Sequence, residues 1–178
     1  RIKKIDVSAC RLPGVHAVLC AGDVPGINDV GAVLMGDPIF AEGETLYAGQ
    51  SVLAVAAETV EIARAAAKAA VIEYEPLPAI LDVHAALAQK SFVGEPYTMK
   101  IGDAVSGIAA AKHVIEGVFD IGGQDHFYLE GQIALAVPQE GGEVYCLSST
   151  QHPTEVQHLI ARSLKIPDHA VTDRKSVV

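Results

Sequence analysis

The sequence predicts two consecutive domains, an α/β domain followed by an α+β domain. Apolar, strand-like segments flank an alanine-rich helical segment between residues 51 and 75. Further along, a glycine pair at residues 141–142 separates two apolar segments that can form a hairpin. Between these regions, residues 89–99 carry Gly94, Pro96 and polar side chains, and we interpret them as a linker.

The first domain is expected to span residues 1–88. Residues 14–20 predict a short buried strand, closed by turn residues. Residues 27–43 are punctuated by glycine and proline and show little periodicity, which predicts a loop with short extended pieces. The apolar run 51–57 predicts a fully buried strand.

The clearest helix of the chain follows that strand. Thr59 can cap it, and residues 62–70 are strong helix formers. Residues 71–75 then alternate as a strand, which Pro76 stops. Strand, helix and strand in this order predict a βαβ crossover.

Aspartates can open two shorter helices. Asp82 can cap a helix over residues 82–88, and Asp103 can cap one over residues 103–111. Residues 113–120 alternate apolar and polar side chains, which predicts a strand.

The second domain is expected to span residues 100–172. A hairpin is predicted from strands over 132–137 and 143–147. Pro153 is suited to the first position of a helix that extends to about residue 164. Residues 170–172 predict the start of a further strand.

Composition excludes several kinds of function. The net charge is −9 and no basic cluster is longer than Lys3-Lys4, which argues against a nucleic-acid or anionic-membrane surface. Cys10, Cys20 and Cys146 form no CxxC, so no disulfide framework, zinc site or iron–sulfur site is indicated. A reducing, cytoplasmic setting fits these thiols. No apolar run approaches the roughly 20 residues of a membrane span.

Both ends of the chain indicate a fragment. It begins at Arg1 without methionine. Residues 173–178 have the character of a sequencing adapter translated in frame, so we expect them to be a non-native tail.

The most distinctive stretch is residues 122–132, where a glycine pair precedes polar and aromatic side chains. Without Cβ atoms, such a pair lets the backbone approach a ligand closely. Gln124 follows the pair directly and offers both a donor and an acceptor; the alternative is a buried glutamine satisfied by backbone groups. Asp125, His126 and Glu130 match no standard ligand spacing, so we expect local hydrogen bonds and no metal site.

Other chemistry-bearing residues are less distinctive. Phe127 and Tyr128 suit either a pocket for a flat substrate or a core. His152, Glu155 and His158 are expected on a solvated or interface helix. The sequence contains no G-x-S-x-G, Walker or G-x-G-x-x-G motif.

Residues 122–140 and 148–153 resemble the xanthine dehydrogenase and aldehyde oxidase family of molybdenum hydroxylases, most of all the molybdenum-binding (large) subunit of bacterial xanthine dehydrogenase. Residues 13–18, 37–40 and 74–80 resemble the same family in the same order. The resemblance implies a hammerhead-like α/β domain, then the truncated start of a molybdopterin-binding domain.

The resemblance also implies a role for Gln124. In the motif GGQ(D/E)HFYLE, the glutamine lies beside the molybdenum centre and hydrogen-bonds an oxygen ligand of the metal. The pterin dithiolene holds the metal, so no protein metal ligand is expected. The family's glycine-rich segment, its substrate-orienting residues and its base glutamate would follow Thr172, so no catalytic residue is assigned and the fragment is predicted to be inactive alone.

The activity implied is water-derived hydroxylation of a heterocycle, from hypoxanthine to xanthine to urate in purine catabolism. Two 2Fe-2S clusters and FAD are expected on a partner subunit, with NAD as electron acceptor. Aldehyde oxidase or another heterocycle hydroxylase is the nearest alternative, and a non-catalytic α/β interaction module is the second.

Overall fold

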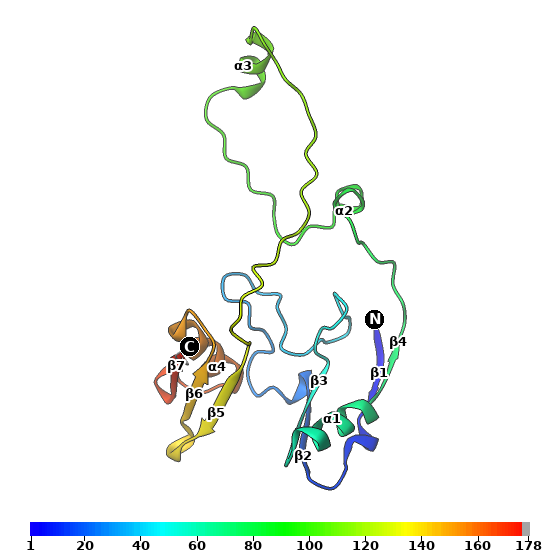
Figure 1. Cartoon of the computed structure of the whole chain (residues 1–178), viewed down its shortest axis with the longest axis vertical. Coiled ribbons are helices and arrows are strands. Elements are labelled where there is room, and N and C mark those ends of the chain that lie inside the picture. Colours follow the sequence, from blue (N-terminus) through cyan, green and yellow to red (C-terminus); the bar gives the residue numbers. More distant parts are fainter. Residues whose placement is uncertain (176–178) are drawn as a thin grey trace. The chain divides into compact units, whose positions relative to one another are not determined.

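The computed structural model (Figure 1) describes residues 1–175, which divide into two units. The larger unit combines Arg1–Leu77 with the described residues from Tyr128 onward. The smaller unit is Pro78–Phe127. Among the described residues, no helix has the length and apolar character to cross a membrane.

Two separate antiparallel strand pairs form the first part of the larger unit. Strand β2 (Val15–Cys20) pairs with β3 (Leu53–Ala57), and β1 (Ile2–Asp6) pairs with β4 (Val71–Tyr74). The predicted βαβ crossover over residues 51–75 is therefore wrong. Its two strands lie in different sheets because each pairs with an earlier strand, and β1 was not predicted.

Helix α1 (Val60–Ala69) was predicted correctly. The hydroxyl of Thr59 accepts a hydrogen bond from the N–H of Ile62 at 3.2 Å, which satisfies one of the free donors at the helix start. Strand β3 is only half-buried, because Ala54 and Ala56 point to solvent while the residues between them are shielded. The prediction of a fully buried strand is therefore wrong.

The second part of the larger unit is a three-stranded sheet with one helix. Strands β5 (Ala134–Pro138) and β6 (Val144–Ser148) form the predicted hairpin, in which Gly141 and Gly142 both have positive φ. Helix α4 (Pro153–Leu164) starts and ends as predicted, with its proline in the first turn. Strand β7 (Val171–Lys175) pairs in parallel with β6, so β6, α4 and β7 form a βαβ unit.

Four short 3-10 helices complete the described elements of the larger unit. They are η1 (Ser8–Cys10), η2 (Ala21–Asp23), η3 (Glu140–Gly142) and η4 (Asp168–Ala170). Residues 173–175 of the predicted tail lie in β7, and residues 176–178 lie outside the described part of the chain. Their non-native origin stays a prediction, as do the domain boundaries.

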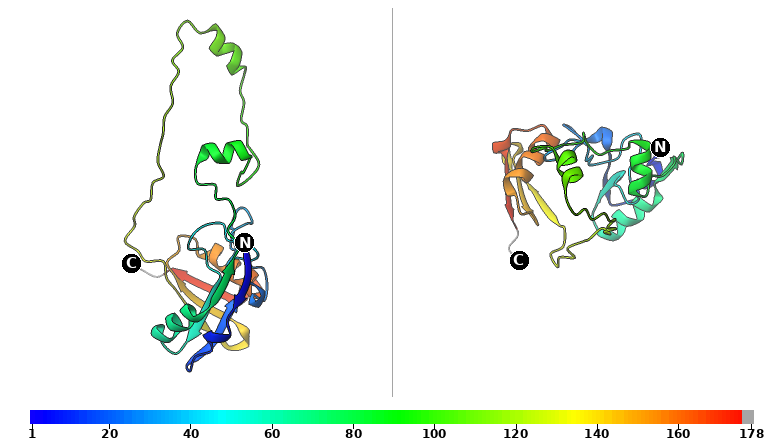
Figure 2. Two further views of the ribbon diagram at one scale, coloured as in Figure 1. Left: turned by 90° about the vertical axis from the view of Figure 1, so that its right-hand side faces the viewer. Right: turned by 90° about the horizontal axis from the view of Figure 1, so that it is seen from above.

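The smaller unit holds two short helices joined by extended chain (Figure 2). Helix α2 (Val83–Gln89) is capped by Asp82 and α3 (Ala104–Ala110) by Asp103, as predicted. Residues 113–120 form no strand, so that prediction is wrong. The smaller unit contains no strand that could pair with this segment.

Candidate functional site

Gln124 lies in an extended segment of the smaller unit that follows α3. Its side chain is exposed, so the amide is open to a ligand and is not satisfied within a core. A Cβ added at Gly122 or at Gly123 would meet nothing within 4 Å. The backbone on the N-terminal side of Gln124 therefore leaves room for a large group, and the buried-glutamine alternative does not apply to this chain.

The acidic neighbours of Gln124 have different partners. The carboxylate of Asp125 accepts a hydrogen bond from the N–H of Phe127 at 2.6 Å, which is the local bonding predicted for it. Glu130 instead pairs with Lys175, whose ammonium lies 2.8 and 3.1 Å from its two oxygens. The prediction of local hydrogen bonding is wrong for Glu130, because β7 brings Lys175 to it from a distant part of the sequence. No three potential ligands gather into a metal site among the described residues.

The aromatic residues of the motif are exposed. Phe127 is 90% and Tyr128 59% accessible, and Leu129 beside them is fully accessible. A core role for these residues is therefore wrong for this chain. Together these three residues form a contiguous exposed apolar run.

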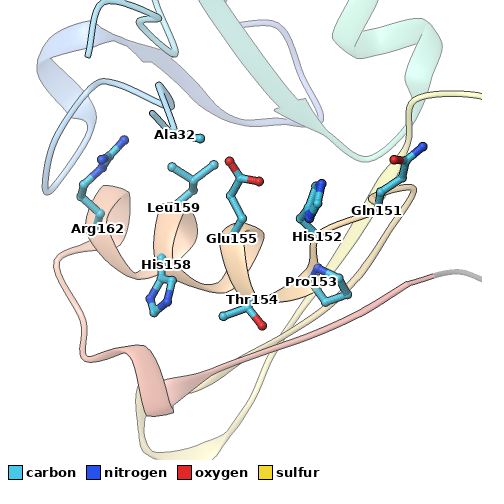
Figure 3. A pocket seen from close by; sticks show the side chains of 9 residues that line it. All are labelled: Ala32, Gln151, His152, Pro153, Thr154, Glu155, His158, Leu159 and Arg162. Atoms are coloured by element: carbon cyan, nitrogen blue, oxygen red, sulfur yellow. The ribbon is translucent and has the colours of Figure 1, made fainter. Parts of the chain in front are cut away.

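A second candidate site is a cavity of about 560 Å³ along α4. Figure 3 shows Glu155, Leu159 and Arg162 pointing to the side of the helix where Ala32 lies, whereas His158 points the other way. His158 pairs with Asp168, with 3.0 Å between Nδ1 and the carboxylate. Residues 155, 159 and 162 share one helical face, a spacing that could have predicted this lining from the sequence.

The chemistry of this cavity is limited. One nitrogen of the Arg162 guanidinium is already engaged, since Nη2 donates to the backbone oxygen of Asp29 at 2.6 Å. Neither His152 nor Glu155, which line the cavity, makes an ion pair with another described residue. The cavity therefore offers polar contacts without a paired acid and base.

The buried thiol of Cys146 is not a nucleophile. Burial raises its pKa, and a hydrogen bond with Asp173 raises it further. The thiol therefore stays protonated at neutral pH, while catalytic cysteines require the thiolate. Asp173 also accepts a hydrogen bond from the hydroxyl of Ser148 at 3.0 Å.

The side-chain amide of Gln124 fits an oxygen-rich cofactor. An amide N–H donates to an oxygen ligand without competing for the metal. The open space over Gly122 and Gly123 is compatible with close approach of a large group.

Comparison with protein families divides the chain in two. Residues 1–78 match the aldehyde oxidase and xanthine dehydrogenase a/b hammerhead domain. Residues 83–178 match the molybdopterin cofactor-binding domain. The predicted fold class, a hammerhead domain followed by part of a molybdopterin-binding domain, is confirmed.

Curated relatives are similar over almost all of this chain. A xanthine dehydrogenase of Dictyostelium discoideum is 40% identical over 96% of the chain, and a xanthine dehydrogenase/oxidase of Mus musculus is 39% identical over 98%. The chain spans about 13% of the length of either relative.

Solved structures share the fold. Quinoline 2-oxidoreductase from Pseudomonas putida 86 has a TM-score of 0.82 and 28% identity, covering all of this chain and 25% of that protein. Aldehyde oxidoreductase from Desulfovibrio gigas has a TM-score of 0.83 and 27% identity, covering 98% of this chain and 21% of that protein.

Proposed function

Because this chain belongs to the molybdenum hydroxylases of the xanthine dehydrogenase and aldehyde oxidase family, we propose that the longer protein containing it is a xanthine dehydrogenase, which converts hypoxanthine to xanthine and xanthine to urate. The single observation that carries the proposal is the 37–40% identity to xanthine dehydrogenases over 96–98% of the chain. Identity to the quinoline and aldehyde oxidoreductases is 27–28%. We assign the chain to a molybdenum-binding large subunit of bacterial type.

In this proposal, residues 122–124 form one edge of the cofactor site. Gln124 would hold the bound cofactor there by donating a hydrogen bond from its side-chain amide to an oxygen of that group. The two glycines before it keep side chains out of the approach. Molybdopterin, when bound, supplies the metal and the redox chemistry of hydroxylation. The amide orients that group and adds no charge to it.

The same proposal includes the remaining parts of the enzyme. A partner subunit carries the 2Fe-2S clusters and FAD, NAD accepts the electrons, and the assembly is cytoplasmic. The exposed apolar run at residues 127–129 supports the expectation of covering protein, because so much accessible apolar surface is costly in an isolated chain.

The test uses the full-length protein, expressed with its partner and loaded with molybdenum. We expect urate to form from xanthine with NAD as acceptor, at a kcat/KM at least tenfold above that for an aromatic aldehyde or quinoline. A protein without bound molybdenum serves as the control for background oxidation. Turnover of the aldehyde or of quinoline, with no urate, would overturn the purine assignment.

A second candidate function rests on the structural neighbours. The TM-scores of 0.82 and 0.83 to quinoline and aldehyde oxidoreductases show that the fold of this region serves several substrate classes. The same assay separates the two candidates. Full-length protein that retains neither molybdenum nor any of these activities would instead support the non-catalytic module.

A further inference from the structure

The C-terminal end of α4 is completed by a loop from the other end of the sequence. A helix leaves its last carbonyls without intrahelical partners. Here the carbonyl of Ser163 accepts a hydrogen bond from the N–H of Gly26 at 2.8 Å, and that of Arg162 accepts one from the N–H of Ile27 at 3.2 Å. A loop of the hammerhead part therefore caps the helix of the molybdopterin-binding part.

The side chain of Arg162 strengthens this contact from the helix side. Its Nη2 donates to the backbone oxygen of Asp29 at 2.6 Å and to that of Gly31 at 3.2 Å. The same nitrogen lies 3.8 Å from the carboxylate of Asp29. Both side chains are largely shielded, with 28% and 13% of their surfaces accessible, so water competes weakly for these bonds.

The loop itself is organised around Asp29. One carboxylate oxygen accepts the N–H of Gly31 at 2.7 Å, and the other accepts those of Gly36 at 2.6 Å and Asp37 at 3.1 Å. Helix and strand are absent from residues 27–43, so these bonds supply the order that secondary structure provides elsewhere. The carboxylate of Asp29 thus shapes the loop, while the backbone oxygen of the same residue accepts a hydrogen bond from Arg162.

Close packing restricts residue 26 to glycine. An added Cβ would lie 2.0 Å from the carbonyl oxygen of Arg162 and 2.9 Å from that of Ser163. Both atoms belong to backbone, so neither can move away as a flexible side chain would. The backbone of the loop therefore packs directly against the backbone of this helix end.

We propose that residues 26–37 form a clasp that couples the hammerhead part to the β6–α4–β7 unit, so that the clasp and the end of α4 unfold locally together. Arg162 is the positioning residue of this clasp. We expect that breaking the clasp from one side also releases the other side.

Hydrogen exchange measured by mass spectrometry on the whole 178-residue chain tests the coupling. In R162Q, we expect exchange to rise about tenfold or more both in residues 26–37 and in the last turn of α4, as loss of charge-assisted hydrogen bonds predicts. D29N alters the opposite side of the clasp and should give the same joint pattern. R64Q, which changes an exposed arginine of α1, is the matched control and should leave both segments unchanged.

The joint response decides the outcome. Exchange that rises in only one of the two segments, or in neither, would overturn the clasp. R162K keeps the charge but loses the forked geometry, so it provides a milder variant if R162Q does not fold. A joint increase in R162K, smaller than in R162Q, supports the proposal, and an R162K pattern equal to that of R64Q overturns it.

Discussion

Replacing Gly26 by alanine is the sharpest test of how the chain packs against α4. The new Cβ would lie 2.0 Å from the carbonyl oxygen of Arg162, whereas ordinary carbon–oxygen contacts begin at about 3.3 Å. The loop must therefore retreat by roughly 1 Å. Such a shift breaks the hydrogen bonds of 2.8 and 3.2 Å from Gly26 and Ile27.

The magnitude follows from those two bonds. Each contributes about 1 kcal/mol net, so their loss costs about 2 kcal/mol. Alanine also reduces the entropy of the unfolded chain, which returns about 0.4–1 kcal/mol. Gly22→Ala has the same unfolded-state benefit, but its Cβ meets nothing within 4 Å. The difference between the two variants therefore isolates the packing term at about 2 kcal/mol.

Urea unfolding followed by circular dichroism measures this difference. With a slope of about 1–3 kcal/mol per molar urea, G26A should unfold about 1 M earlier than G22A. Equal midpoints for the two variants would contradict this prediction, because the main-chain contact would then contribute nothing to stability. A lower midpoint in G22A than in G26A would refute it as well.

Four further predictions concern the caps, pH and the candidate site. Thr59→Ala removes the hydrogen bond to the N–H of Ile62 and should lower the free energy of unfolding by about 1 kcal/mol in the same urea assay. The N–H groups that donate to Asp29, that of Gly36 foremost, lower the pKa of its carboxyl below the ordinary 3.8. The stability that this carboxylate contributes is therefore full above 3.8 and declines as pH falls through the folded-state pKa. In D29N, urea midpoints measured from pH 6 to pH 3 should show a smaller decline toward acid pH. Gln124→Ala in the full-length, molybdenum-loaded enzyme should lower kcat about tenfold or more, while the melting temperature of the 178-residue chain stays unchanged because the side chain is exposed; unchanged kcat and molybdenum content would contradict the assigned role. The 178-residue chain alone, mixed with molybdopterin, should form no urate, and any measurable urate would contradict the prediction that it is inactive by itself.

Helix ends and tight turns were predictable from sequence because their causes lie within a few residues. The carboxylates of Asp82 and Asp103 each accept an N–H three positions later, and Pro153 opens α4 where its missing N–H costs nothing. The glycine pair at 141–142 likewise supplies the positive φ values of its own hairpin. All of these interactions are local.

Strand pairing was less predictable, since an alternating pattern does not specify a partner. The segments at 53–57 and 71–74 have the order of a βαβ unit, yet they pair with β2 and β1. Residues 113–120 show the alternation of a strand but have no neighbouring strand in their unit. The parallel pair lies instead between β6 and β7.

At the candidate site, the residue types can be read from the sequence alone: a glycine pair, and after it an amide that can both donate and accept. Their surroundings come from the fold, since exposure depends on every segment that does or does not fold over the motif. The same division holds at α4. Its length was readable from the sequence, but the donors that complete its last turn come from a loop more than 130 residues earlier, because an unsatisfied helix carbonyl accepts whichever N–H the fold brings within reach.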